Sequence, residues 1–103
     1  MATKENKEVQ NYVLEIRELS RKLWEQLREL DAPHYTQERL LKILLDEDDR
    51  DELAGSIADA KAINGIDYKM ESRPQRKAEL FGKAYKYLEA LTLVKEIDEM
   101  LTR

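Results

Sequence analysis

The most charged segment of the sequence runs from Asp46 to Glu52 and carries six carboxylates and one cation, Arg50. Closely spaced carboxylates can form a calcium loop, in which a glycine makes a tight turn and a glutamate closes the site. The sequence departs from that pattern three times. Arg50 stands where an oxygen ligand belongs, Asp51 where the glycine belongs, and Ile57 where the closing glutamate belongs. We therefore interpret the run as the solvated acidic start of a helix, which the helix dipole favours.

Glu15 and Glu18 have an E-x-x-E spacing, which places both carboxylates on one face of a helix. Together with residues 51–67, this spacing resembles the all-α nucleotide pyrophosphohydrolases, which hold magnesium with E-x-x-E and E-x-x-D pairs. The resemblance implies a magnesium-dependent hydrolase whose carboxylates converge in one pocket. Those carboxylates would be Glu15, Glu18, Asp48 or Asp49, and Glu52. The third position after Glu52 is Gly55, so one expected ligand is missing, and this activity is the alternative to a non-enzymatic function.

Nucleophilic and zinc chemistry find little support in the residue types present. The chain has one histidine, His34, and no cysteine, so a thiolate nucleophile or a Cys/His zinc site is excluded. His34 follows Pro33 in an expected loop, and no local serine and carboxylate complete a triad with it. We interpret His34 as an exposed loop residue, and we predict no catalytic residue, metal site or cofactor.

The first half of the last expected helix is basic. Its cations are Arg73, Arg76, Lys77, Lys83 and Lys86. With tyrosines nearby, such a patch could bind nucleic acid, which is a second, weaker alternative. However, Tyr85 shares an apolar arc with Phe81 and Leu88, so it is expected to point into the core. The net charge of −4 also argues against nucleic acid as the main partner, because that binding requires neutralised phosphates. We interpret the patch as a solvated helix face.

The composition indicates which elements must position these side chains. The 103 residues are 42% hydrophobic and 39% charged, with three glycines and two prolines, which is typical of long amphipathic helices in one domain. A single helical domain is expected over residues 1–103. No apolar run is long enough to span a bilayer, the polar start does not resemble a secretory signal, and zero cysteine fits a reducing compartment. The expectation is a cytoplasmic protein with no membrane partner.

The apolar periodicity predicts an all-α four-helix bundle with helices at residues 5–31, 36–46, 49–64 and 73–102. The long first and last helices would frame the two shorter ones. The first helix carries one apolar stripe, formed by Val9, Tyr12, Val13, Ile16, Leu19, Leu23, Trp24, Leu27 and Leu30. Thr36 is the expected N-cap of the second helix. Because no apolar residue occurs between Asp46 and Glu52, a break is expected there, although one continuous helix over residues 36–64 would give a three-helix bundle.

The link between the last two helices is expected to be extended. Asn64 and Gly65 are predicted to end the third helix, because glycine suits a left-handed C-cap. The alternation of apolar residues from Ile66 to Met70 then indicates a short extended segment. Ser72 is predicted to cap the last helix, with Gln75 three residues later and Pro74 in the first turn.

Two apolar surfaces predict protein–protein contact. In the last helix the apolar arc rotates by about 100° along its length, because apolar residues recur every three positions beyond Leu88. The side chains expected to contact a partner there are Leu91, Leu93, Val94, Ile97, Met100 and Leu101. Small residues four apart on the third helix, Ala54 and Ala58, are a second candidate. The sequence therefore predicts a non-enzymatic interaction or assembly module, with a homo-oligomer favoured and a hetero-partner possible.

Overall fold

A computed structural model describes residues 4–31 and 34–102, with side chains described from Asn11 onward. It contains four helices, α1 (Lys4–Arg28), α2 (Gln37–Leu45), α3 (Glu47–Met70) and α4 (Pro74–Leu101), and no strand in those residues. This confirms the predicted all-α four-helix bundle. None of the helices within these two ranges is long and apolar enough to cross a membrane.

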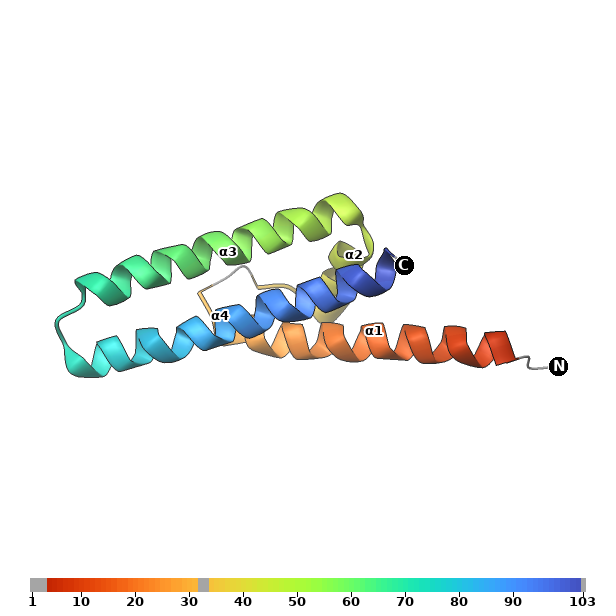
Figure 1. Cartoon of the computed structure of the whole chain (residues 1–103), viewed down its shortest axis with the longest axis horizontal. Coiled ribbons are helices and arrows are strands. Elements are labelled where there is room, and N and C mark those ends of the chain that lie inside the picture. The colour runs from red at the N-terminus through yellow and green to blue at the C-terminus, as the bar shows by residue number, and fades with distance from the viewer. Residues whose placement is uncertain (1–3, 32–33, 103) are drawn as a thin grey trace.

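The helices form an elongated molecule with extents of 64 × 24 × 23 Å. α3 and α4 make a long antiparallel hairpin, α1 lies along the C-terminal part of α4, and the short α2 covers one end (Figure 1). The closed end of the hairpin extends past the end of α1, and the first turns of α1 extend past the end of α4 (Figure 1). Among the described residues no Cα atom of α1 lies within 8 Å of a Cα atom of α3, so the two helices meet only through side chains of the core.

The predicted break between the second and third helices is confirmed, and it lies at Asp46. The Asp46 carboxylate accepts a hydrogen bond from the backbone N–H of Asp49 at 2.9 Å and thereby caps α3. Thr36 caps α2 as predicted, because its hydroxyl oxygen accepts from the N–H of Arg39 at 3.2 Å. The continuous helix over residues 36–64 is therefore excluded. α1 ends at Arg28, three residues earlier than predicted, and Ala32 and Pro33 lie outside the described residues.

The predicted end of the third helix at Asn64 and Gly65 is wrong. α3 continues to Met70, so the residues from Ile66 onward are helical rather than extended. The Asn64 side chain is buried, and its Nδ2 donates to the carbonyl oxygen of Leu80 in α4 at 2.9 Å. Asn64 therefore lies inside α3, where its amide is bonded to α4, and does not end the helix. No glycine in the described ranges has a positive φ.

Ser72 does not cap the last helix, which is a second correction. The N-cap position of α4 is Arg73, which makes no side-chain cap, while Pro74 occupies the first turn as predicted. Glu71 instead organises the turn between α3 and α4. Its carboxylate accepts from the backbone N–H of Arg73 at 3.1 Å and from the Arg73 guanidinium at 2.8 and 3.1 Å. These bonds lower the pKa of Glu71 to about 2.

This pKa predicts an acid-dependent turn. The carboxylate is ionised more readily in the folded chain, so its stabilisation is complete above its ordinary pKa of 4.5 and is lost as the pH falls toward about 2. In a Glu71→Gln variant the melting temperature should be lower than that of the wild type at pH 6, and the difference should close between pH 4.5 and 2. Thermal melts followed by circular dichroism at several pH values measure this. An unchanged difference at pH 2 would contradict it.

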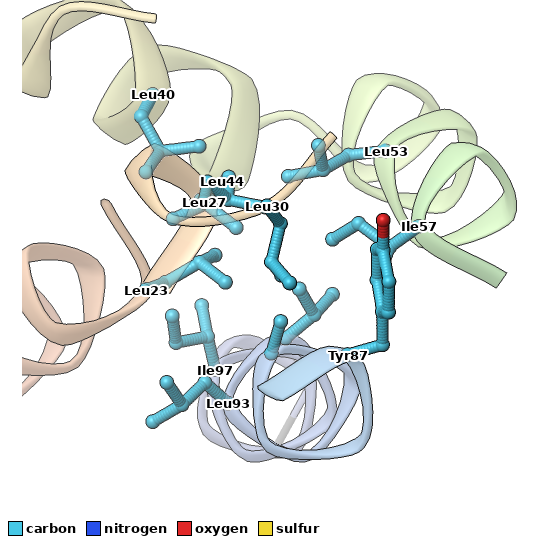
Figure 2. Close-up of a cluster of buried hydrophobic side chains, with 12 residues drawn as sticks. Leu23, Leu27, Leu30, Leu40, Leu44, Leu53, Ile57, Tyr87, Leu93 and Ile97 are labelled. Atoms are coloured by element: carbon cyan, nitrogen blue, oxygen red, sulfur yellow. The ribbon is translucent and has the colours of Figure 1, made fainter. Parts of the chain in front are cut away.

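The core lies where all four helices meet. Each helix contributes buried side chains that point toward those of the other helices (Figure 2). They are Leu23 and Leu27 of α1, Leu40 and Leu44 of α2, Leu53 and Ile57 of α3, and Tyr87, Leu93 and Ile97 of α4. Of the predicted α1 stripe, Ile16, Leu23, Leu27 and Leu30 are buried, whereas Val13 is 45% exposed and the side chain of Val9 is not described. The predicted stripe is therefore the core-facing side of α1 from Ile16 onward.

Arg50 is a buried cation beside this core, although its place in the acidic run predicted a solvated side chain. Its side chain is 3% exposed, and its Nε lies 2.8 Å from Oδ1 of Asp98 in α4. Its Nη1 donates to the carbonyl oxygen of Leu44 at the end of α2, also at 2.8 Å. A helix end leaves its last carbonyls unpaired, and Arg50 satisfies one of them. One side chain of α3 therefore joins α2, α3 and α4.

The segment before α2 is held to α1 by the only tryptophan. The indole N–H of Trp24 donates to the carbonyl oxygen of Tyr35 at 2.7 Å. The guanidinium of Arg28 lies 4.8 Å from the centre of the same ring. Trp24 thus helps to position α2 against α1, which agrees with its interpretation as a structural residue.

Candidate functional site

The surface expected at the end of the last helix belongs largely to the core. Four of its six residues, Leu93, Val94, Ile97 and Met100, are buried within the chain itself. Leu91 and Leu101 are half-buried and pack against the same core. The prediction that these side chains face a partner is corrected, because α1 and α2 pack across this part of α4 and cover it.

In the first half of α4, side chains that were predicted to be buried are exposed instead. Phe81, Tyr85 and Leu88 were expected in the core, but 51%, 62% and 50% of their surfaces are exposed. The side chains of α4 that face α3 are instead Leu80 and Tyr87, which are buried. The apolar arc does rotate along α4, but the structure places the early part outside and the late part inside.

The exposed residues form a regular stripe along α4. Its members share one helical face and recur at alternating steps of four and three residues. We call this set the α4 stripe: Pro74, Ala78, Phe81, Tyr85, Leu88 and Thr92, all exposed. This spacing is the seam pattern of helices that pack side by side over several turns. Eighteen residues separate its ends, so the stripe is about 27 Å long at the rise of an α-helix.

The centre of the α4 stripe is ordered by aromatic contacts. The Phe81 and Tyr85 rings meet edge-on with centroids 5.4 Å apart. Phe81 also packs against Tyr68 of α3, with centroids 5.9 Å apart, and the Lys77 ammonium lies 4.8 Å from the centre of the Tyr68 ring. Because these contacts restrict the side chains before any partner binds, the entropic cost of ordering them on binding is reduced.

The helical positions of α3 extend this surface across the hairpin. At 100° per residue, Ala54, Ala58 and Gly65 lie within about 80° of Tyr68, which contacts Phe81 of the α4 stripe. Ala54 is half-buried against the core, whereas Ala58 is exposed. The second predicted surface therefore lies beside the α4 stripe, with Ala58 available and Ala54 partly covered. We call this combined surface, on the side of α3 and α4 away from α1 and α2, the outer face of the hairpin.

Other exposed apolar side chains are less extended. Ile63, Ile66 and Met70 are exposed on α3, but at 100° per residue Ile63 and Met70 lie about 140° or more around the helix from Tyr68. They therefore belong to a different face, which covers only two turns. Leu14 and Leu45 are isolated on α1 and α2, and single exposed apolar residues are normal on protein surfaces.

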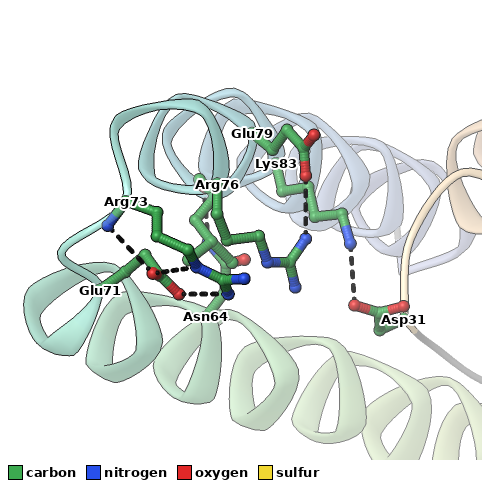
Figure 3. Close-up of polar contacts among 8 residues, drawn as sticks. Asp31, Asn64, Glu71, Arg73, Arg76, Glu79 and Lys83 are labelled. Atoms are coloured by element: carbon green, nitrogen blue, oxygen red, sulfur yellow. Dashed lines mark hydrogen bonds and ion pairs between the residues drawn. The ribbon is translucent and has the colours of Figure 1, made fainter.

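Each cation of the predicted basic patch has a partner within the chain. Arg73 pairs with Glu71 at 2.8 Å and Arg76 with Glu79 at 3.1 Å, and Lys83 pairs with Asp31 at 2.9 Å (Figure 3). Lys86 pairs with Glu29 at 2.8 Å, and Lys77 lies over Tyr68. The hydrogen bonds and charges of Lys86 and Lys83 lower the pKa values of Glu29 and Asp31. These pairings reduce the positive field that phosphate binding would need.

The carboxylates of the hydrolase alternative are not brought together. Glu15 and Glu18 lie on α1, where Glu18 pairs with Arg21. In the part of the chain that the structure describes, no Cα atom of α1 lies within 8 Å of a Cα atom of α3, whose first turns carry the acidic run. Asp49 and Glu52 line an open groove of about 210 Å³ between α2 and α3 that also contains Arg39. In the described ranges no three His, Cys, Asp or Glu residues are placed to hold a metal. His34 is exposed in the loop before α2, as expected.

A second groove, of about 290 Å³, lies between α1 and the start of α2. It is lined by Arg17, Arg21 and Glu38 together with the buried Ser20. Its charges have mixed sign, and Arg21 is already paired with Glu18 and Glu25. The groove is therefore not built for an anion or a cation.

No protein-family model matches the chain, and neither a curated protein nor a solved structure shows significant similarity to it.

Proposed function

We propose that this chain is a non-enzymatic interaction module that binds a helix of another protein molecule on the outer face of the hairpin. The observation that carries the proposal is the α4 stripe, an ordered apolar seam exposed to solvent at Phe81, Tyr85 and Leu88. A second helix can lay its own side chains between those of a seam with this spacing. The cytoplasm is the compartment we propose, since a chain without cysteine suits a reducing environment.

The apolar residues of the stripe supply the expected affinity. Fully burying a leucine or phenylalanine side chain is worth about 1.5–3 kcal/mol, so covering the exposed halves of the three large side chains contributes about 1 kcal/mol each. Aromatic residues at the centre of an interface commonly dominate its binding energy. Phe81 and Tyr85 are therefore the expected anchors, and Leu88 completes the contact.

Photo-crosslinking tests the proposal directly. A benzophenone amino acid at position 85 should give one defined crosslinked species in a lysate of the source cells, and unlabelled chain should compete with it. The same amino acid at position 45 is the matched control, because Leu45 is 54% exposed on another part of the molecule.

The stripe variant Leu88→Glu should remove the crosslink at position 85. Its far-ultraviolet circular dichroism should match that of the wild type, since Leu88 is half exposed and contributes little to the core. The proposal would be wrong if position 85 gave no species beyond those at position 45, or if Leu88→Glu left the crosslink intact while folded.

A further inference from the structure

We infer that the molecule bound on the outer face is a second copy of this chain, packed with its hairpin antiparallel to the first about a two-fold axis. The inference rests on the proposed function and names its partner. A second copy fits the distribution of charge along the outer face, the symmetry of its small and apolar residues, and its area.

The charges of the outer face are separated along its length. By helical position, the face carries Lys69 of α3 and Lys77 of α4 at the closed end of the hairpin, and Lys61 of α3 lies near its middle. At the opposite end it carries four carboxylates and one lysine. These are Glu47 and Asp51 at the start of α3, and Lys95, Glu96 and Glu99 near the end of α4, all exposed. The face is therefore basic at the closed end and acidic at the other end, with the apolar α4 stripe between them.

Only one orientation of a second copy makes these charges complementary. An antiparallel pair places the basic end of each face over the acidic end of the other. A parallel pair would place lysines over lysines and carboxylates over carboxylates, which is unfavourable. The charge pattern therefore selects the antiparallel arrangement.

The same arrangement aligns the middle of the face. With the axis passing α4 between positions 86 and 87, Tyr85 of one copy packs on Leu88 of the other, and Phe81 packs on Thr92. In α3 the axis passes near Ala58, so that Ala58 meets its own counterpart. An alanine at this position lets the two α3 helices approach closely, while the larger side chains of α4 fill the other half of the interface.

The outer face is also large enough for a dimer. From Glu47 to Lys69 on α3, and from Lys77 to Glu99 on α4, the face is about 33 Å long. Two adjacent helices are about 20 Å wide, so each copy offers about 660 Å² and the pair buries about 1,300 Å². Specific interfaces begin at about 1,200 Å². An interface at the low end of this range predicts a reversible dimer.

Charge reversal and sedimentation velocity test the inference on the intact chain. Lys69→Glu with Lys77→Glu makes both ends of the face acidic, and Asp51→Lys with Glu99→Lys makes both ends basic. Each double variant should dimerise at least tenfold more weakly than the wild type. The quadruple variant, in which the two ends again carry opposite net charge, should dimerise more tightly than either double variant, which an unfolded or damaged chain could not do.

The outcomes separate this inference from the proposed function. A wild-type chain that stays monomeric up to about 0.5 mM, or a quadruple variant as weak as either double variant, would overturn the antiparallel dimer. If the lysate crosslink at position 85 persisted under that result, the binding surface would stand and its partner would be another protein. If the crosslink were also absent, both proposals would fail.

Discussion

Replacing Arg50 with alanine should lower the free energy of unfolding by about 3 kcal/mol. The substitution removes a side chain that is 3% exposed and leaves the Leu44 carbonyl at the end of α2 without its partner. Asp98 keeps access to water, since its side chain is 42% exposed, so the loss lies at the low end of the range for broken buried ion pairs. Urea denaturation followed by circular dichroism measures the change.

Two further variants separate the contributions of Arg50. Asp98→Asn should cost only about 1 kcal/mol, because the amide oxygen can still accept from the Arg50 Nε. Arg50→Met retains much of the buried volume but makes no hydrogen bond, so it should lie between the wild type and Arg50→Ala. An Arg50→Ala variant within 0.5 kcal/mol of wild type, in the range of ordinary surface substitutions, would show that the three-helix junction contributes nothing.

The second large effect is expected at Ile97, on the buried side of α4. Ile97 is fully buried among residues of all four helices, so Ile97→Ala should destabilise the fold by about 3–4 kcal/mol through lost burial and the cavity left behind. Leu88→Ala is the matched control on the exposed side of α4. It should cost less than about 1 kcal/mol, because half of Leu88 is exposed.

The comparison of these two positions checks the assignment of the faces of α4. Equal losses at Ile97 and Leu88 would contradict it. For the same reason, a charged substitution at Val94 or Ile97 should unfold the chain rather than dissociate an assembly. Binding experiments therefore require substitutions in the α4 stripe.

The start of α2 and the break before α3 could be predicted from the sequence because local interactions determine them, whereas the predicted cap at Ser72 was wrong. Thr36 and Asp46 cap the helices that follow them, and the lack of apolar residues after Asp46 marks the break between α2 and α3. The class of fold followed from the periodicity and the shortage of glycine and proline. The end of α3 could not be predicted in this way, because Asn64 is held by Leu80, sixteen residues away.

The buried and exposed faces of α4 also depend on contacts between residues far apart in the sequence, so the candidate site could not be predicted from local patterns. Apolar residues cover about half the circumference of this helix, and periodicity alone does not say which of them meet a neighbour. The positions of α1 and α2 decide which residues of α4 are buried. These two helices pack on the C-terminal part of α4 and bury Leu93 and Ile97. A sequence signal for the exposed stripe was nevertheless present, in the unbroken four-three spacing from Pro74 to Thr92.

The position of Trp24 separates two processes that dilution could otherwise confuse. The indole is bonded to Tyr35 on the α1–α2 side of the molecule, away from the outer face of the hairpin. Its fluorescence emission therefore follows the docking of α2, and dissociation of the proposed dimer would leave its surroundings unchanged. A shift in emission at low concentration is a sign of lost tertiary structure, whereas a change in sedimentation without that shift is a sign of separated subunits.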